Sequence, residues 1–135
     1  MGVDVGGNSN GWWPVARYWW VTLADYSHHV APTVTAACRY WYTSNEDGLN
    51  ADQARKLGAE LQRSIDDCRI DEYACQLFPV LLNDKQFRCL VEFQDDGAEI
   101  FELSKPDERR FVNEFASQVQ RFIEFLLSCE GFRIR

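Results

Sequence analysis

Three side chains near residue 28 are of types that can perform acid–base chemistry. Asp25, His28 and His29 fall within one turn of an expected helix, where they could activate a serine or cysteine nucleophile brought close by the fold. No nucleophile motif such as G-x-S-x-G accompanies them. Histidines at the C-terminal end of a helix also interact favourably with the helix dipole, and we favour this ordinary role. The sequence therefore favours a protein that is not an enzyme, with an enzyme as the alternative.

The first seven residues, MGVDVGG, raise the possibility of a phosphate-binding hairpin, because sugar kinases and actin-like ATPases often have such a sequence there. In those proteins the glycine turn joins two long strands, and the nucleotide lies between two large domains. Here Trp12-Trp13-Pro14 follows Gly7 within five residues and is expected to open a helix, which leaves no room for a second strand. A chain of 135 residues is also too short for both domains. We therefore expect no nucleotide site of this type, although the glycine loop could hold an anion on its backbone N–H groups.

A small-molecule pocket is the alternative functional prediction. It would form if the fold brought together the glycine-rich start, the N-E-D-G turn and the two histidines, and its candidate residues are Asp4, His28, His29, Asn45 and Asp47. The same turn does not make a calcium loop, because Thr43 and Ala54 stand where the first and last ligands belong. The five cysteines include no CxxC pair and are expected to be free thiols. We expect neither a metal nor another cofactor.

The hydrophobic pattern predicts the elements that would position these residues. A period of 3.6 predicts a helix from Trp12 that ends near Ala31-Pro32, whereas the segment after it, residues 33–42, stays undecided. Further helices are expected after Asn50, which with Gln53 forms a capping box, and after Asp71, with Pro79 kinking or ending the helix. A period of two then predicts a hairpin over residues 87–103, and a long amphipathic helix over 111–129 closes the chain. The predicted fold is α+β: a mostly helical single domain over residues 1–135, with a small antiparallel hairpin or sheet and a long C-terminal helix.

Aromatic residues provide the main signal for a binding surface. All five tryptophans and four of the five tyrosines lie within residues 12–42, more than one helix can bury. Trp13 and Trp20 fall beside the main apolar stripe, so we expect them to be partly exposed and to anchor a partner. The alternative is equally favoured: these rings pack on the core or at its edge and bind no partner.

The charge distribution adds a second part to this predicted surface. The net charge of −7 argues against direct nucleic-acid binding, which depends on Lys and Arg. Acidic residues concentrate in residues 84–102, so a partner with a basic surface would be attracted there, although solvated charge that keeps a protein soluble is the commoner explanation. The acidic candidates for partner binding are Asp95, Asp96 and Glu99.

Location is predicted from what the chain lacks. No apolar run approaches the ~20 residues of a membrane helix, and the start does not resemble a signal peptide. We therefore expect a cytoplasmic protein of a bacterial host cell with no membrane partner. The oligomeric state stays open.

Several stretches together resemble a family of small uncharacterised bacterial and phage proteins. They are MGVDVGG at the start, GWWPVARYW, the SNEDGLNADQARKLGAEL turn and helix, and FIEFLLSCEGFRI at the end. The turn is one residue shorter than in that family, Cys129-Glu130 replaces a small pair, and the CxxC pairs of some members are absent. No activity is established for the family, so the resemblance implies a bacterial or phage origin and one domain rather than a mechanism. The function it fits is a non-enzymatic protein-binding module, such as a phage-borne inhibitor of a host defence or a bacterial immunity-type protein.

Overall fold

The computed structural model describes residues 2–9, 11–43, 47–83, 89–94, 97–102, 104 and 107–134. The fold is α+β and mostly helical, as predicted. The helices of the described residues are α1 (Arg17–Val30), α2 (Pro32–Thr35), α3 (Ala51–Asp66), α4 (Arg69–Asn83) and α5 (Glu108–Ser128). The strands are β1 (Gly2–Gly7), β2 (Gly11–Ala16), β3 (Asp47–Asn50), β4 (Cys89–Gln94), β5 (Gly97–Glu102) and β6 (Gly131–Ile134). Among these residues, no helix is long and apolar enough to span a bilayer.

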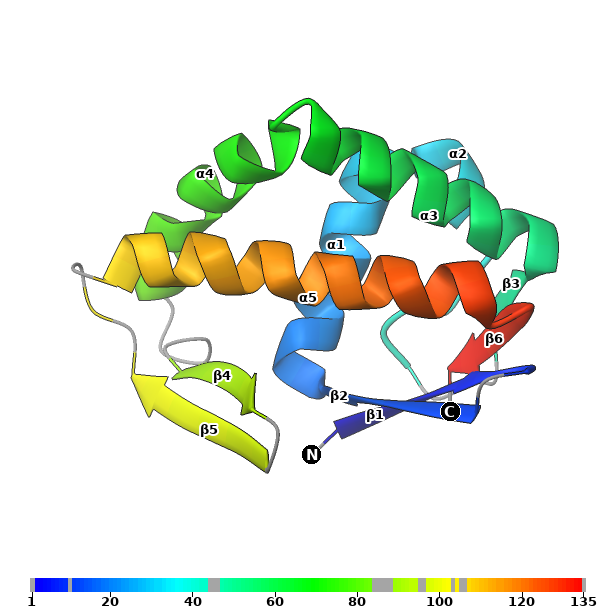
Figure 1. The fold of residues 1–135 in the computed structure, drawn as a ribbon, viewed down its shortest axis with the longest axis horizontal. Coiled ribbons are helices and arrows are strands. Elements are labelled where there is room, and N and C mark those ends of the chain that lie inside the picture. The colour runs from blue at the N-terminus through cyan, green and yellow to red at the C-terminus, as the bar shows by residue number, and fades with distance from the viewer. Residues whose placement is uncertain are drawn as a thin grey trace.

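The long helix α5 is the centre of the molecule. In Figure 1 it crosses the whole width, with α3 and α4 arched above it and α1 behind it. Strands β1, β2, β3 and β6 lie at its C-terminal end, and the β4–β5 hairpin lies near its N-terminal end. The apolar face that the sequence predicted for α5 is buried: Phe111, Phe115 and Phe122 are each 0% exposed.

The N-terminal segment corrects the sequence prediction. Residues from Trp12 to Ala16 form strand β2 rather than the start of α1, so there is room for a second strand after Gly7. Strands β1 and β2 are antiparallel and pair from Gly2 opposite Ala16 to Gly7 opposite Gly11. Pro14 fits because β2 is an outer strand of the order β2-β1-β6-β3, where a missing N–H need not interrupt the ladder. The four-residue spacing from Trp12 to Ala16 fits a helix, but five residues are too few for the hydrophobic period to distinguish a helix from a strand.

The last strand, β6, is an element that the sequence analysis missed. It lies between β1 and β3 and is antiparallel to both, so the two ends of the chain share one sheet. Helix α5 ends at Ser128, and Gly131, with a φ of 97°, begins this strand. A run of four residues after a helix stop carries too little periodic pattern to predict a strand.

The other elements follow the predicted pattern with shifted ends. The capping box is confirmed: the Asn50 side chain accepts from the Gln53 N–H while the Gln53 side chain accepts from the Asn50 N–H. Helix α4 begins at Arg69 and continues past Pro79. The hairpin is confirmed as β4 and β5, whose register places Glu92 opposite Glu99. The predicted turn residues Asp95 and Asp96 lie outside the described residues.

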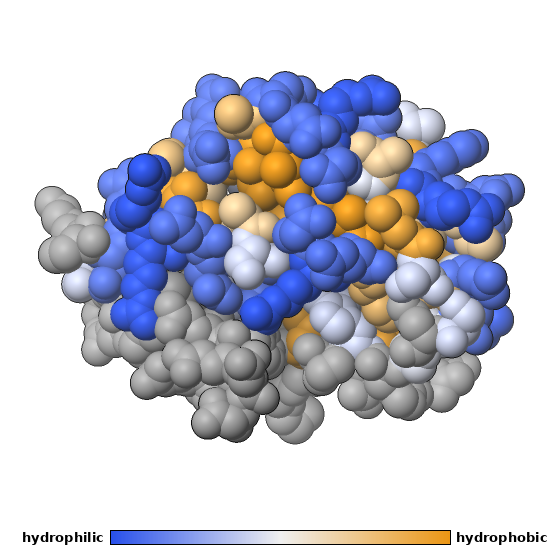
Figure 2. Space-filling model, viewed as in Figure 1, coloured by the Kyte–Doolittle hydropathy of each residue, from blue (hydrophilic) through white to orange (hydrophobic). Residues whose placement is uncertain are grey.

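The core is aromatic and lies between α5, α1 and the sheet. In the coloured part of Figure 2, hydrophilic residues surround apolar residues that gather where α5 lies against α3 and α4. The rings within the core contact one another: Trp20 lies edge-on to Phe122 and to Phe132, with centroids 5.7 and 6.5 Å apart. Trp41 is stacked on Trp20 at 5.8 Å. Trp20, Trp41, Phe122 and Phe132 are called the aromatic core below.

Candidate functional site: an aromatic loop beside a polar pocket

The segment that follows α2 returns to the body of the protein through one buried side chain. Trp41 is 1% exposed and packs on Trp20 and Phe132. Its indole N–H donates to the Thr35 carbonyl oxygen (3.1 Å), and its own carbonyl oxygen accepts from the Trp20 indole N–H (2.6 Å). The indole N–H and the carbonyl oxygen of Trp41 are thus both hydrogen-bonded in the interior, as buried polar groups require. These bonds and the ring packing fix the position of the segment.

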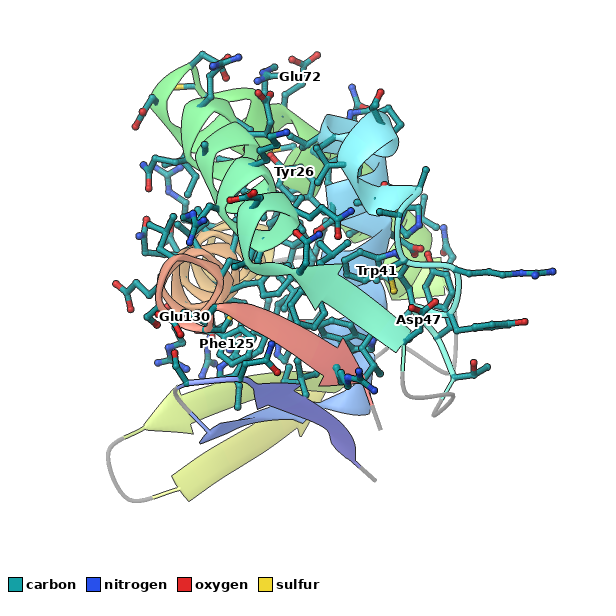
Figure 3. All side chains as sticks on the ribbon, turned by 90° about the vertical axis from the view of Figure 1, so that its right-hand side faces the viewer. Tyr26, Trp41, Asp47, Glu72, Phe125 and Glu130 are labelled. Atoms are coloured by element: carbon teal, nitrogen blue, oxygen red, sulfur yellow. The ribbon has the colours of Figure 1, made fainter. Side chains whose placement is uncertain are left out.

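A carboxylate fixes the same segment from the other side. One oxygen of Asp47, the first residue of β3, accepts from the backbone N–H of Arg39 (2.7 Å) and of Tyr40 (3.2 Å). The other oxygen accepts from the N–H of Gly48 (2.9 Å). Figure 3 shows Asp47 and Trp41 on the same side of the molecule, near strand β3. Residues 39–43 are called the aromatic loop below. The buried Trp41 side chain fixes this loop to the core, and Asp47 holds its backbone.

The pKa of Asp47 reflects this arrangement. Partial burial acts to raise the pKa of this carboxyl, but hydrogen bonds from the three amides, with the charge of Arg133, lower it below its ordinary value. Asp47 is therefore ionised at neutral pH, and its charge is used to hold the aromatic loop.

The outward side of the aromatic loop presents large side chains to solvent. Tyr40 is 39% exposed and Tyr42 is 45% exposed, whereas Trp41 between them is buried. The Arg39 guanidinium lies over the Tyr40 ring, 5.3 Å from its centroid. One arginine and two tyrosines are thus exposed on a short segment whose backbone Asp47 and Trp41 hold in place.

Tyr42 is oriented by residues of α1. Its hydroxyl donates to Asp25 Oδ1 (2.5 Å), and its ring stacks on His28 with centroids 6.0 Å apart. Partial burial, with the hydrogen bond to Asp25, raises the pKa of Tyr42, so the hydroxyl stays protonated at neutral pH. The Nδ1 atom of His28 lies 2.6 Å from the Ala24 carbonyl oxygen; since a carbonyl only accepts, Nδ1 is the protonated donor.

A shallow pocket of about 290 Å³ adjoins the aromatic loop. Its lining includes Asp47, which holds the loop, and Phe132, which packs on Trp41. Its other lining residues are Asn8, Gly48, Leu49, Asn50 and Arg133.

This pocket contains only part of the predicted small-molecule site. Asp47 lines it, but neither histidine does: His28 packs on Trp41 and Tyr42, and His29 packs on Tyr26 and Tyr73. This pocket therefore does not unite the two histidines with the N-E-D-G turn. They are neighbours on a helix and face different surroundings. The side chain of Asp4 and the whole of Asn45 lie outside what the structure describes.

The predicted exposed anchors also need correction. Trp20 is 1% exposed and belongs to the aromatic core, so the expectation that it is an exposed anchor is wrong. The reason is its position opposite both α5 and β6, a tertiary arrangement that helix periodicity does not reveal. Trp13 is half-buried, and its ring stacks on Phe122 (5.3 Å) and Phe125 (5.4 Å). The side chain of Glu99, like Asp95 and Asp96, is not among those described.

The glycine-rich hairpin tip has a structural role that opposes anion binding. The N–H groups of Asn8 and Ser9 donate to the carbonyl oxygens of Gly131 (2.9 Å) and Cys129 (3.0 Å). The side chains of the same two residues donate to the carbonyls of Glu130 and Ser128. These donors satisfy carbonyls of residues 128–131, where α5 ends and β6 begins, so they are not directed at a bound anion.

The N-E-D-G-L-N segment is explained by structure in the same way. Asp47 holds the aromatic loop, Leu49 is 3% exposed, and Asn50 caps α3. At Gly48 a Cβ atom would lie 1.7 Å from the Phe132 carbonyl oxygen, so only glycine fits at this position of the β3–β6 pairing.

The cysteines are free wherever they are described. Cys38 and Cys129 are buried, whereas Cys68 and Cys75 are exposed. Burial, followed by the nearby charge of Asp47, raises the pKa of the Cys38 thiol to about 12, so this thiol is protonated and unreactive at neutral pH. Within the described ranges, no group of three or more His, Cys, Asp or Glu side chains is arranged to hold a metal ion.

Sequence reasoning missed Arg39, Tyr40, Tyr42 and Arg133. The available signal was the R-Y-W-Y pattern of residues 39–42. In an extended segment alternate residues face opposite sides, so Tyr40 and Tyr42 would face one side and Trp41 the other.

Comparison with protein-family models, curated proteins and solved structures finds no match to this chain. The site is therefore interpreted from its own geometry.

Proposed function

We propose that this chain is a non-enzymatic protein-binding module whose contact surface is the aromatic loop. The observation that carries the proposal is the contrast within three consecutive residues: Tyr40 and Tyr42 are 39% and 45% exposed, and Trp41 between them is 1% exposed. The backbone at Arg39 and Tyr40 is held by the Asp47 carboxylate. The exposed rings are thus presented by a segment that is already ordered.

This arrangement suits binding for two physical reasons. Tyrosine and arginine are enriched among the residues that contribute most to protein–protein affinity, because they combine large contact area with polar groups. A loop that is ordered before binding loses less conformational entropy when the complex forms, so more of the contact energy appears as affinity. An inhibitor or immunity-type protein, which acts by covering a partner, requires such a surface and no catalytic group.

The acidic segment of residues 84–102 is proposed to assist binding as a separate surface. Its charges would speed the approach of a partner that carries a basic region, and salt would screen this effect. Trp13, half-buried against α5, contributes mainly to packing.

Site-specific photo-crosslinking tests the proposal. A photoreactive phenylalanine analogue replaces Tyr42, or, as the control, Val80, which is 63% exposed on α4. After irradiation in cells of the source organism, the variant with the probe at position 42 should form a discrete adduct that the position-80 variant lacks. Adding Tyr40→Ala to the position-42 variant should abolish the adduct. An adduct at position 80 and none at position 42 would contradict the aromatic loop as the contact surface.

The pocket of about 290 Å³ supports a second candidate, a small polar ligand bound between Asn8, Asp47 and Arg133. Unlike the predicted site, this one does not use the histidines. A thermal-shift screen of small polar metabolites tests it: a compound that raises Tm for the wild type, and not for Arg133→Gln, would favour this candidate.

A further inference from the structure

Two arginines, Arg39 within the aromatic loop and Arg133 on the neighbouring strand β6, have guanidinium groups without an ion-pair partner among the described residues. Both arginines are exposed. The backbone N–H of Arg39 donates to the Asp47 carboxylate, and Arg133 lies opposite Gly48, the residue after Asp47, in the pairing of β3 with β6. Arg133 also lines the pocket beside the loop.

The described carboxylates on this face are already used inside the protein. Asp47 accepts three backbone N–H groups. Asp25 accepts the Tyr42 hydroxyl. The acceptors therefore serve internal hydrogen bonds, whereas the guanidinium groups of the two arginines keep donors that can face a partner.

Guanidinium groups in this setting favour one class of ligand group. Each presents N–H donors in a planar fork that matches the two oxygens of a carboxylate. The Tyr40 and Tyr42 rings, both partly exposed, offer apolar surface on the same loop. A carboxylate next to an apolar side chain would satisfy both parts of the surface.

We propose, building on the proposed binding function, that the partner presents an acidic peptide segment to this face. Asp or Glu carboxylates of that segment are bound by Arg39 and by Arg133, and a neighbouring apolar side chain lies on Tyr40 and Tyr42. The net charge of the chain is −7, so long-range attraction does not draw in the acidic segment itself and can act only on a basic region elsewhere on the same partner. The local arginines must then act mainly by slowing dissociation.

Selection from a random-peptide display library tests the proposal on the intact chain. The selected peptides are synthesised with a fluorescent label, and their Kd values are measured by fluorescence polarisation with four proteins. These are the wild type, Arg39→Gln/Arg133→Gln, Tyr40→Ala/Tyr42→Ala, and the charge-matched control Lys56→Gln/Arg109→Gln, which removes two exposed charges elsewhere. Circular dichroism melts establish that each variant is folded.

The proposal predicts peptides rich in Asp and Glu. Their Kd should rise about tenfold or more with Arg39→Gln/Arg133→Gln and less than about twofold with the control pair, because only the first pair contacts the ligand. The tyrosine variant should also weaken binding.

Other outcomes separate the two proposals. Peptides that require the tyrosines but are not acidic, or that bind the arginine variant equally well, would overturn the acidic-partner proposal and leave the binding function standing. If no peptide is enriched, or the peptides bind independently of the tyrosines, both proposals fail. A labelled single-stranded oligonucleotide that binds more tightly than the peptides, and is lost in both variants, would assign the face to nucleic acid and overturn the acidic-peptide proposal.

Discussion

Trp41 and Tyr42 are adjacent aromatic residues that belong to regions with opposite surroundings. Trp41 lies in the aromatic core, 1% exposed and stacked on Trp20. Tyr42 lies on the aromatic loop, 45% exposed and oriented by Asp25 and His28. Asp47 joins the two regions, because its strand pairs with the strand of Phe132 while its carboxylate holds the backbone of the loop.

The difference teaches that aromatic content by itself does not define a binding surface. The tryptophans that are described lie in or against the core, and the tyrosines of the aromatic loop are the exposed rings. The core residues should therefore control stability, and the loop residues should control binding. The following predictions test this separation.

The largest expected effect on stability comes from a substitution at Gly48, the residue after Asp47 in β3. Gly48→Ala would place a Cβ atom 1.7 Å from the Phe132 carbonyl oxygen, and a backbone atom cannot move aside cheaply. Strands β3 and β6 would have to separate, so we expect a loss of about 4 kcal/mol or more in the free energy of unfolding. Urea denaturation followed by circular dichroism measures it.

Gly11→Ala is the matched control. Gly11 has φ of 72°, and no neighbouring atom lies within 4 Å of the point where its Cβ would stand, so the added methyl costs only backbone strain. We expect a loss of about 1 to 2 kcal/mol there. Equal losses at Gly11 and Gly48 would mean that β3 and β6 are not as close as described.

The contrast between adjacent rings gives the next effect. Trp41→Ala removes a buried side chain together with its hydrogen bond to Thr35, so unfolding free energy should fall by about 3 to 5 kcal/mol. Tyr42→Ala should cost less than about 1 kcal/mol, because the ring is at the surface. The same denaturation experiment compares them, and similar losses in both variants would contradict the separation of core from loop.

The smallest effect is a dependence on pH. Folding lowers the pKa of Asp47 below its ordinary value of 3.8. The contribution of the ionised carboxylate to the free energy of unfolding is therefore fully present above pH 3.8. It is lost as pH falls through the lower pKa of the folded state. The backbone amide resonances of Arg39 and Tyr40 should titrate in this acidic range by NMR and should not do so in Asp47→Asn. Amides that titrate identically in both proteins would show that another group controls the loop.

Much of the fold was predictable because its helices are long and strongly patterned. The apolar stripe of α5, the capping box at Asn50 and the alternation in β4 and β5 are local signals, and the structure confirms them. Strands β2 and β6 were missed because each is short and depends on pairing, β2 with β1, and β6 with β1 and β3, which are distant from it in sequence.

The candidate site was less predictable for the same reason. The burial of Trp20 depends on β6, and the role of Asp47 depends on where the loop returns to the sheet. The turn around Asp47 was recognised as important from its sequence. Its role in holding Arg39 and Tyr40 required the tertiary structure, because hydrogen bonds between a loop and a strand leave no periodic signal.

Amide hydrogen exchange of the aromatic loop tests the central claim, that its exposed rings stand on a backbone fixed before any partner binds. Arg39 and Tyr40 lie on exposed surface, yet their N–H groups donate to Asp47. In the wild type, both amides should exchange at least about tenfold more slowly than the same amides in Asp47→Ala, because exchange requires the hydrogen bonds to open. Exchange at the same unprotected rate in the two proteins would contradict a preorganised loop, and with it the physical basis for the binding surface.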